Sequence, residues 1–172
     1  MKSRPILLSM MLLFTVTLLG QGWNSMVNDE KLNKPVMIGN CDKKGLTKGE
    51  YGMYFNSQYE LYDPAGKYVN KLKDKITGVE IRIVFGSWCH DSKVQVPRFM
   101  KVLSEAGYDD RDLIIIGVNT NKSALVMNIE NLDIERVPTF IVYQNGEELG
   151  RIIETPSKTL EKDLWKIVRK AK

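Results

Sequence analysis

The residues most capable of chemistry lie in one short segment, residues 87–93, with the sequence Ser-Trp-Cys-His-Asp-Ser-Lys. The segment directly follows an apolar run at residues 79–85, whose β-branched composition is typical of a buried strand, and the residues after Ser92 have helical spacing. Cys89 is therefore predicted to lie where a strand gives way to a helix. The unpaired N–H groups and the positive dipole end of such a helix start stabilise a thiolate. The sequence thus indicates thiol chemistry at Cys89.

The neighbours of Cys89 are further candidate site residues. Trp88 would shield one side of the thiol and contact a substrate, although core packing explains it equally well. His90, the single histidine of the chain, would stabilise a thiolate as a cation, and it also fits an ordinary surface position. Asp91 and Ser92 suit the first turn of a helix, where acidic and hydroxyl side chains satisfy free N–H groups. In a catalytic role, Asp91 would carry a proton to a departing thiol, and Ser92 would donate a hydrogen bond to the thiolate.

The Cys-His-Asp triplet is not predicted to hold a metal. Three adjacent residues at a helix start rarely converge on one ion, and no further Cys or His lies nearby in sequence. No cofactor is predicted either. The alternative interpretation of Cys89 itself is an inert, buried cysteine.

Taken together, these residues resemble thioredoxin. A Trp-Cys-x-x-Ser motif follows the strand, Pro97 lies beyond the cysteine, and Val-Pro-Thr-Phe at residues 137–140 opens a later strand. More narrowly, residues 86–99 are similar to exported thioredoxin-like proteins of Bacteroidetes-type bacteria, many of which carry Trp-Cys-Gly-Asp-Ser. The resemblance covers roughly residues 79–171. It implies an α/β thioredoxin fold, in which a central mixed sheet is flanked by helices, here with an N-terminal helical extension.

The resemblance also implies a second half of the site. Pro138 would be cis and face the cysteine, leaving the backbone of Val137 free to pair with a substrate strand; a trans proline at a strand start is the alternative. Two departures from thioredoxin matter. Ile83 occupies the position of a buried acid that assists proton transfer, and Ser92 replaces the second, resolving cysteine. Monothiol exchange through Cys89 remains chemically feasible.

The other cysteine of the chain, Cys41, has three predicted fates. It is the candidate resolving thiol if it comes within reach of Cys89. It would alternatively form a structural disulfide with Cys89, which would silence the nucleophile, or form no bond at all.

Residues 1–22 have the form of a secretory signal peptide. Lys2 and Arg4 precede an almost uninterrupted apolar run, and Gly-Gln-Gly at residues 20–22 supplies a small-x-small cleavage pattern. The run is too short for a comfortable membrane span, so an uncleaved anchor is the weaker alternative. The protein is therefore expected to be exported, periplasmic or secreted, with no stable membrane anchor.

The charge balance argues against nucleic-acid or membrane-surface binding. The whole chain has 25 basic and 21 acidic residues, a formal net charge of +4, and loss of Lys2 and Arg4 leaves 23 against 21, or +2. The predicted partners are instead thiols and disulfides of the cell envelope, with an external reducing partner.

The chain divides into the signal peptide, a partly helical extension at residues 23–78 and a thioredoxin-like domain at residues 79–172. In the extension, residues 23–40 are expected to be irregular or extended. Aromatic residues recur at helical spacing over residues 46–62, which favours packing of this helix onto the core over an aromatic binding face. In the domain, the order is strand, helix, strand, a short helix near residues 123–129, a hairpin turning at Asn145-Gly146, and a final helix at residues 157–170.

These observations predict an exported monothiol thiol–disulfide oxidoreductase or isomerase that acts on envelope proteins through Cys89. The leading alternative is a non-redox peptide-binding or holdase module that uses the groove around Trp88 and Pro138 while the cysteine is idle. A structural envelope protein with a Cys41–Cys89 disulfide is a third hypothesis.

Overall fold

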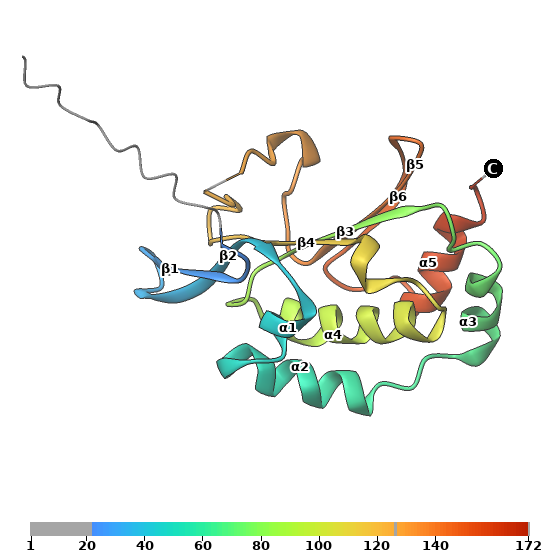
Figure 1. The fold of residues 1–172 in the computed structure, drawn as a ribbon, viewed down its shortest axis with the longest axis horizontal. Coiled ribbons are helices and arrows are strands. Elements are labelled where there is room, and N and C mark those ends of the chain that lie inside the picture. Colours follow the sequence, from blue (N-terminus) through green and yellow to red (C-terminus); the bar gives the residue numbers. More distant parts are fainter. Residues whose placement is uncertain (1–21, 126, 172) are drawn as a thin grey trace, which may run out of the picture.

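A six-stranded mixed sheet forms the centre of the protein in the computed structural model, which describes residues 22–125 and 127–171. The expected signal peptide lies, apart from Gly22, outside these residues. The sheet order is β1-β2-β4-β3-β5-β6, with β3 and β4 parallel and the other neighbouring pairs antiparallel (Figure 1). The strands are β1 (Ser25–Asp29), β2 (Lys34–Cys41), β3 (Glu80–Phe85), β4 (Leu113–Gly117), β5 (Thr139–Gln144) and β6 (Glu147–Ile153).

Helices cover one face of this sheet. They are α1 (Lys43–Leu46), α2 (Gly49–Leu61), α3 (Gly66–Lys73), α4 (His90–Glu105) and α5 (Leu160–Val168). Figure 1 shows these helices on one side of the strands. Buried side chains of α2 to α5 form one apolar cluster with the strands, in which Phe99 of α4 stacks on Phe140 of β5 with ring centroids 4.2 Å apart. This arrangement confirms the predicted α/β fold with a mixed sheet flanked by helices and helices in the N-terminal extension. No helix within the described residues is long and apolar enough to span a membrane.

The opposite face of the sheet is covered by the long connection between β4 and β5. Its buried residues Ala124, Ile129 and Leu132 pack in a second cluster with Val84 and Ile141 of the sheet. The prediction of a short helix near residues 123–129 is wrong. The described part of that range is irregular, and a 3-10 helix follows at Glu130–Leu132. Lys122 and Leu125 have φ angles of 60° and 55°, and this left-handed backbone does not continue into a right-handed helix.

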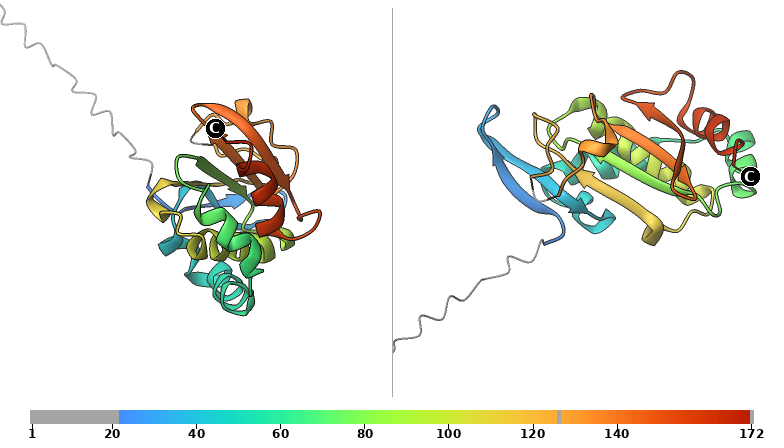
Figure 2. Two further views of the ribbon diagram at one scale, coloured as in Figure 1. Left: turned by 90° about the vertical axis from the view of Figure 1, so that its right-hand side faces the viewer. Right: turned by 90° about the horizontal axis from the view of Figure 1, so that it is seen from above.

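Residues 23–40 were expected to be irregular or extended, and most of them form the β1–β2 hairpin at one end of the molecule (Figure 2). β2 pairs with β4, so the N-terminal extension and the rest of the chain share one sheet. Gly117 permits the close approach, because a Cβ there would lie 2.6 Å from the carbonyl oxygen of Met37.

Asp29 links this hairpin to the β4–β5 connection through hydrogen bonds. Its carboxylate accepts hydrogen bonds from the backbone N–H of Thr120 at 2.8 Å and from those of Lys31 and Leu32 at 3.0 Å. The Thr120 N–H is the main reason why the pKa of Asp29 lies below its ordinary value. The ionised carboxylate therefore ties together two segments that are far apart in the sequence.

Two local predictions are confirmed by the backbone. Asn145 and Gly146 have φ angles of 52° and 82° and join β5 to β6 in a tight hairpin, as the Asn-Gly pair indicated. In α2, Tyr51 and Phe55 are buried against the core while Tyr54 is exposed, so the aromatic stripe serves mainly in packing.

Candidate functional site

Cys89 is the residue immediately before α4, which begins at the carboxyl end of β3. The thiol is free and partly exposed. The carbonyl of Cys89 accepts the Lys93 N–H at 3.1 Å, as expected for the residue that opens a helix, yet no side chain caps the first turn. The N–H groups of that turn therefore have no side-chain acceptor, and they lie directly after Cys89 at the positive end of the helix dipole.

The register of the sheet brings Val137 and Pro138 to Cys89. Val84 of β3 pairs with Thr139 of β5 in antiparallel fashion, so the start of β5 lies beside the end of β3. The Val137–Pro138 peptide bond is cis, and the Cys89 thiol donates a hydrogen bond to the Val137 carbonyl at 3.2 Å. In the thiol form, Cys89 thus takes up one of the two acceptor positions of the Val137 carbonyl.

Trp88 lies flat against the turn that precedes the thiol. Its indole Nε1–H donates to the Val118 carbonyl at 2.9 Å, and its ring fills the space above Gly86, where a Cβ would lie 2.6 Å from the ring. The side chain is half-buried and contacts the second apolar cluster, as does Cys89. Trp88 therefore packs in the core with one part of its ring and retains an accessible part beside the thiol.

Ser92 is fully buried, and its hydroxyl accepts the Gly86 N–H at 3.2 Å. Ser92 and the Cys89 thiol form no hydrogen bond with each other in this structure, in which the thiol donates to the Val137 carbonyl, and the predicted bond from Ser92 to the thiolate stays a prediction. Ser92 instead ties the start of α4 to the turn after β3. It holds Cys89 in place through the backbone.

His90 and Asp91 extend from the first turn of α4, and His90 is exposed whereas Asp91 is half-buried. Neither side chain forms a hydrogen bond or ion pair with another described residue. Both side chains are therefore accessible, His90 more so than Asp91, at the start of the helix that follows Cys89.

Cys41 occupies a different environment. It is 1% exposed at the end of β2, in the cluster on the helix-covered face, whereas Cys89 contacts the cluster on the other face. Burial raises the pKa of the Cys41 thiol to about 12, so the thiolate is strongly disfavoured. Both cysteines are free. In this conformation Cys41 is therefore not placed to resolve a mixed disulfide at Cys89.

Tyr51 is a site residue that sequence reasoning assigned only to packing. Its hydroxyl reaches from α2 to donate to the carbonyl of Ser92 at 2.9 Å, and its ring contacts Phe85 with centroids 5.4 Å apart. Burial, together with the proximity of Cys41 and Cys89, raises the pKa of Tyr51 well above its ordinary value, so the phenol stays protonated as a donor. Nothing in the local sequence separates Tyr51 from the other tyrosines of the stripe.

Replacement of Tyr51 by Phe is expected to lower the free energy of unfolding by about 1–2 kcal/mol, because a buried hydrogen bond to the start of α4 is lost. The matched control is Tyr54→Phe, whose hydroxyl belongs to an exposed side chain on the same helix and should cost less than about 0.5 kcal/mol. Urea unfolding followed by circular dichroism measures both. Equal values for the two variants would show that the Tyr51 contact does not stabilise the site.

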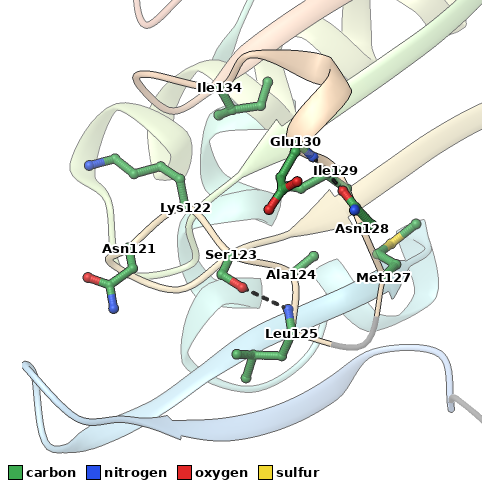
Figure 3. A pocket seen from close by; sticks show the side chains of 10 residues that line it. All are labelled: Asn121, Lys122, Ser123, Ala124, Leu125, Met127, Asn128, Ile129, Glu130 and Ile134. Atoms are coloured by element: carbon green, nitrogen blue, oxygen red, sulfur yellow. Dashed lines mark hydrogen bonds between the residues drawn. The ribbon is translucent and has the colours of Figure 1, made fainter.

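Two cavities lie at the surface near this end of the sheet. One of about 430 Å³ is bounded by Ser87 and Trp88 and by residues of β2 and the start of α2. A second of about 590 Å³ is enclosed by the β4–β5 connection, where the Ser123 hydroxyl accepts the Leu125 N–H at 3.2 Å (Figure 3). Neither cavity is lined by Cys89 or Pro138, but the first is bounded by the two residues that precede Cys89. Among the described residues, no group of three or more His, Cys, Asp and Glu side chains could hold a metal ion.

Comparisons with known proteins found similar sequences and similar structures. No family model matches the chain. The thioredoxin AMT13 of Alternaria alternata is 32% identical over 77 residues, which cover 45% of this chain and 60% of that protein.

Among solved structures, a protein of unknown function from Pseudomonas aeruginosa is 14% identical with a TM-score of 0.50, over 70% of this chain and 82% of its own. The oxidised mitochondrial thioredoxin 3 of Saccharomyces cerevisiae is 17% identical with a TM-score of 0.38, over 66% of this chain and 98% of its own. The sequence match to a thioredoxin and the mixed sheet with its helices together support the thioredoxin-like superfamily, although the chain spans only 60% of the length of that relative.

Proposed function

We propose that this protein is an exported monothiol thiol–disulfide oxidoreductase or isomerase that acts on proteins of the cell envelope through Cys89. The observation that carries the proposal is the contrast between the two thiols. Cys89 is partly exposed at the start of α4, 3.2 Å from the carbonyl before Pro138, whereas Cys41 is enclosed in the core. Such a site has one nucleophile and no resolving partner of its own.

In the proposed reaction, the Cys89 thiolate attacks one sulfur of a substrate disulfide. A bond forms between Cys89 and that sulfur, and the substrate disulfide breaks and releases its other sulfur as a thiolate. In isomerisation, another substrate thiolate then attacks the substrate sulfur of the mixed disulfide. A new substrate disulfide forms, Cys89 leaves as a thiolate, and no net oxidation or reduction occurs.

Net reduction requires an external thiol in two steps. One external thiolate attacks the Cys89 sulfur and releases the substrate as a free thiol, leaving the external thiol bonded to Cys89. A second external thiolate attacks that bonded external sulfur, forms an external disulfide and restores Cys89. The external thiol is thereby oxidised while the substrate disulfide is reduced, which is why an external reducing partner belongs to the proposal.

The Val137 carbonyl couples the charge of Cys89 to substrate binding. The thiol donates to this carbonyl, but a thiolate has no proton to donate and would be repelled by the oxygen. Ionisation of Cys89 therefore frees that acceptor position of the carbonyl for an N–H from an extended substrate segment, as in strand addition at a sheet edge. The reactive form of Cys89 is thus also the form with an open backbone acceptor beside it.

Export and the envelope targets rest on the pattern of residues 1–22, and an oxidising compartment is where substrate disulfides persist. Trp88 and His90 would contact the substrate, since they are the sequence neighbours of Cys89 and have accessible surface. In this proposal, Asp91 in the first turn of α4 carries a proton to the leaving thiolate.

The proposal is tested by the recovery of activity of scrambled ribonuclease in a buffer of reduced and oxidised low-molecular-weight thiol. The protein is expected to accelerate recovery well beyond an equal concentration of free cysteine. Recovery no faster than with free cysteine would contradict the proposal and favour the peptide-binding alternative.

A further inference from the structure

The cavity of about 430 Å³ adjoins the turn that carries the reactive thiol. Ser87 and Trp88, the two residues before Cys89, form part of its wall. The Ser87 hydroxyl accepts the Met37 N–H of β2 at 2.9 Å, so the turn and the opposite wall are directly linked. Since neighbouring Cα atoms are about 3.8 Å apart, the cavity begins within one or two residue lengths of Cys89.

The charges at this cavity are predominantly positive. Lys34 and Lys48 are both exposed on its lining, and neither ammonium group forms an ion pair with a carboxylate of the described residues. Glu50 also lines the cavity, but its carboxylate pairs with Lys93 at 3.4 Å, and the Lys93 ammonium lies 4.3 Å from the centre of the Tyr54 ring. Two uncompensated cationic groups therefore face this space.

The rest of the lining offers apolar contacts. Met26, Pro35 and Met37 of the hairpin lie opposite Trp88, and Met26 is 55% exposed although its side chain is apolar. A ligand with an apolar side chain at this position would cover Met26, and an adjacent carboxylate on the same ligand would pair with Lys34 or Lys48. This combination of contacts fits neither a neutral nor a cationic ligand.

We propose that this cavity binds the segment of a substrate polypeptide beside its target cysteine, and that it selects an acidic residue next to an apolar one. A polypeptide fits better than a free small thiol, because the cavity is lined by Ser87 and Trp88 but not by Cys89, so its occupant must extend along the chain to reach the sulfur. At about 3.3–3.6 Å per extended residue, the acidic residue lies two or three positions from the cysteine. This inference rests on the proposed function, for which it names the substrate class.

The test uses short peptides with one cysteine, activated as its 2-thiopyridyl disulfide, and either Glu-Leu or Lys-Leu beginning two positions from that cysteine. Attack by Cys89 on the peptide sulfur releases 2-thiopyridone, which is followed by its absorbance. The wild type is expected to react about fivefold faster with the Glu peptide, because two partly exposed lysines each contribute a modest attraction. The double variant Lys34→Glu, Lys48→Glu should reverse that preference.

The control variant Lys73→Glu, Lys75→Glu makes the same charge change at exposed positions near the end of α3, at the opposite end of the molecule from the hairpin (Figure 1). It should retain the preference for the Glu peptide. Equal rates with both peptides in the wild type, or an unchanged preference in the Lys34, Lys48 variant, would overturn the inference. So would a preference for a free small carboxylate-bearing disulfide over its neutral analogue without any preference between the peptides.

Neutral 2,2′-dithiodipyridine separates this inference from the proposed function. The wild type and the Lys73→Glu, Lys75→Glu control should react with it at rates within about twofold of each other, since the reagent is neutral and these lysines lie away from the cavity. If Cys89 in the wild type does not react even with this reagent, the proposed function fails. If the reagent reacts but the peptides are not distinguished, only the cavity assignment fails.

Discussion

With the variant Cys89→Ser, disulfide isomerisation is expected to proceed no faster than without protein. A hydroxyl at this position is neither a usable nucleophile toward sulfur nor able to form a mixed disulfide, and the remaining cysteine is enclosed in the core. The measurement is the recovery of scrambled ribonuclease at equal protein concentrations. The effect should be complete because no other described thiol lies in the site.

Cys41→Ala is the matched control for this loss. It removes the other sulfur of the chain and leaves a small cavity, so it should lower stability modestly while preserving the rate of isomerisation. Retention of activity in Cys89→Ser, or its loss in a folded Cys41→Ala protein, would show that the reactive thiol has been assigned to the wrong cysteine.

Phe99→Ala is expected to lower the free energy of unfolding by about 3–5 kcal/mol, the range for removal of a buried aromatic side chain. Phe99 is fully buried in the middle of α4, and its ring stacks on Phe140 at 4.2 Å between centroids. This contact holds α4, which begins after Cys89, against β5, which begins after Pro138. The consequence is a looser site as well as a less stable protein.

Urea unfolding of this variant, compared with Met53→Ala, measures the effect. Met53 is exposed on α2, so its truncation should change the unfolding free energy by less than about 0.5 kcal/mol. A loss below about 1 kcal/mol for Phe99→Ala would mean that α4 is not held by this contact.

The parts of the fold that could be predicted from the sequence are those specified by neighbouring residues. The apolar run before Cys89 and the helical spacing after it locate β3 and α4, and Asn145-Gly146 locates the last hairpin. Each depends on local backbone preferences, which a sequence displays directly.

Contacts between distant segments could not be predicted in this way. The hydrogen bond from Tyr51 to Ser92 and the burial of Cys41 depend on how α2 and β2 pack against the segment around Cys89. The cavity beside Ser87 depends on the same packing. Spacing alone identified an amphipathic helix, but the residue that contacts the site is selected by tertiary structure.

The measurement that tests the central claim most directly is site-resolved alkylation of the native protein by iodoacetamide at neutral pH, with the chain unfolded in urea as reference. Cys89 should react in the native protein at least as fast as in the unfolded chain, because its thiol is free and partly exposed at the start of α4. Cys41 should remain unmodified until the protein unfolds.

The pH dependence at Cys41 has a definite sign. Burial raises the folded-state pKa of Cys41 to about 12, above its value in the unfolded chain. The folded protein is therefore favoured by the protonated Cys41 thiol, and this contribution to the free energy of unfolding is complete below the unfolded pKa and is lost as the pH rises toward 12. Native protein should therefore protect Cys41 at neutral pH and lose that protection in strong alkali.

Fast modification confined to Cys89 would support a single nucleophile held by the start of α4. Slower modification of Cys89 in the native protein than in the unfolded chain, or equal modification of both cysteines, would contradict the account.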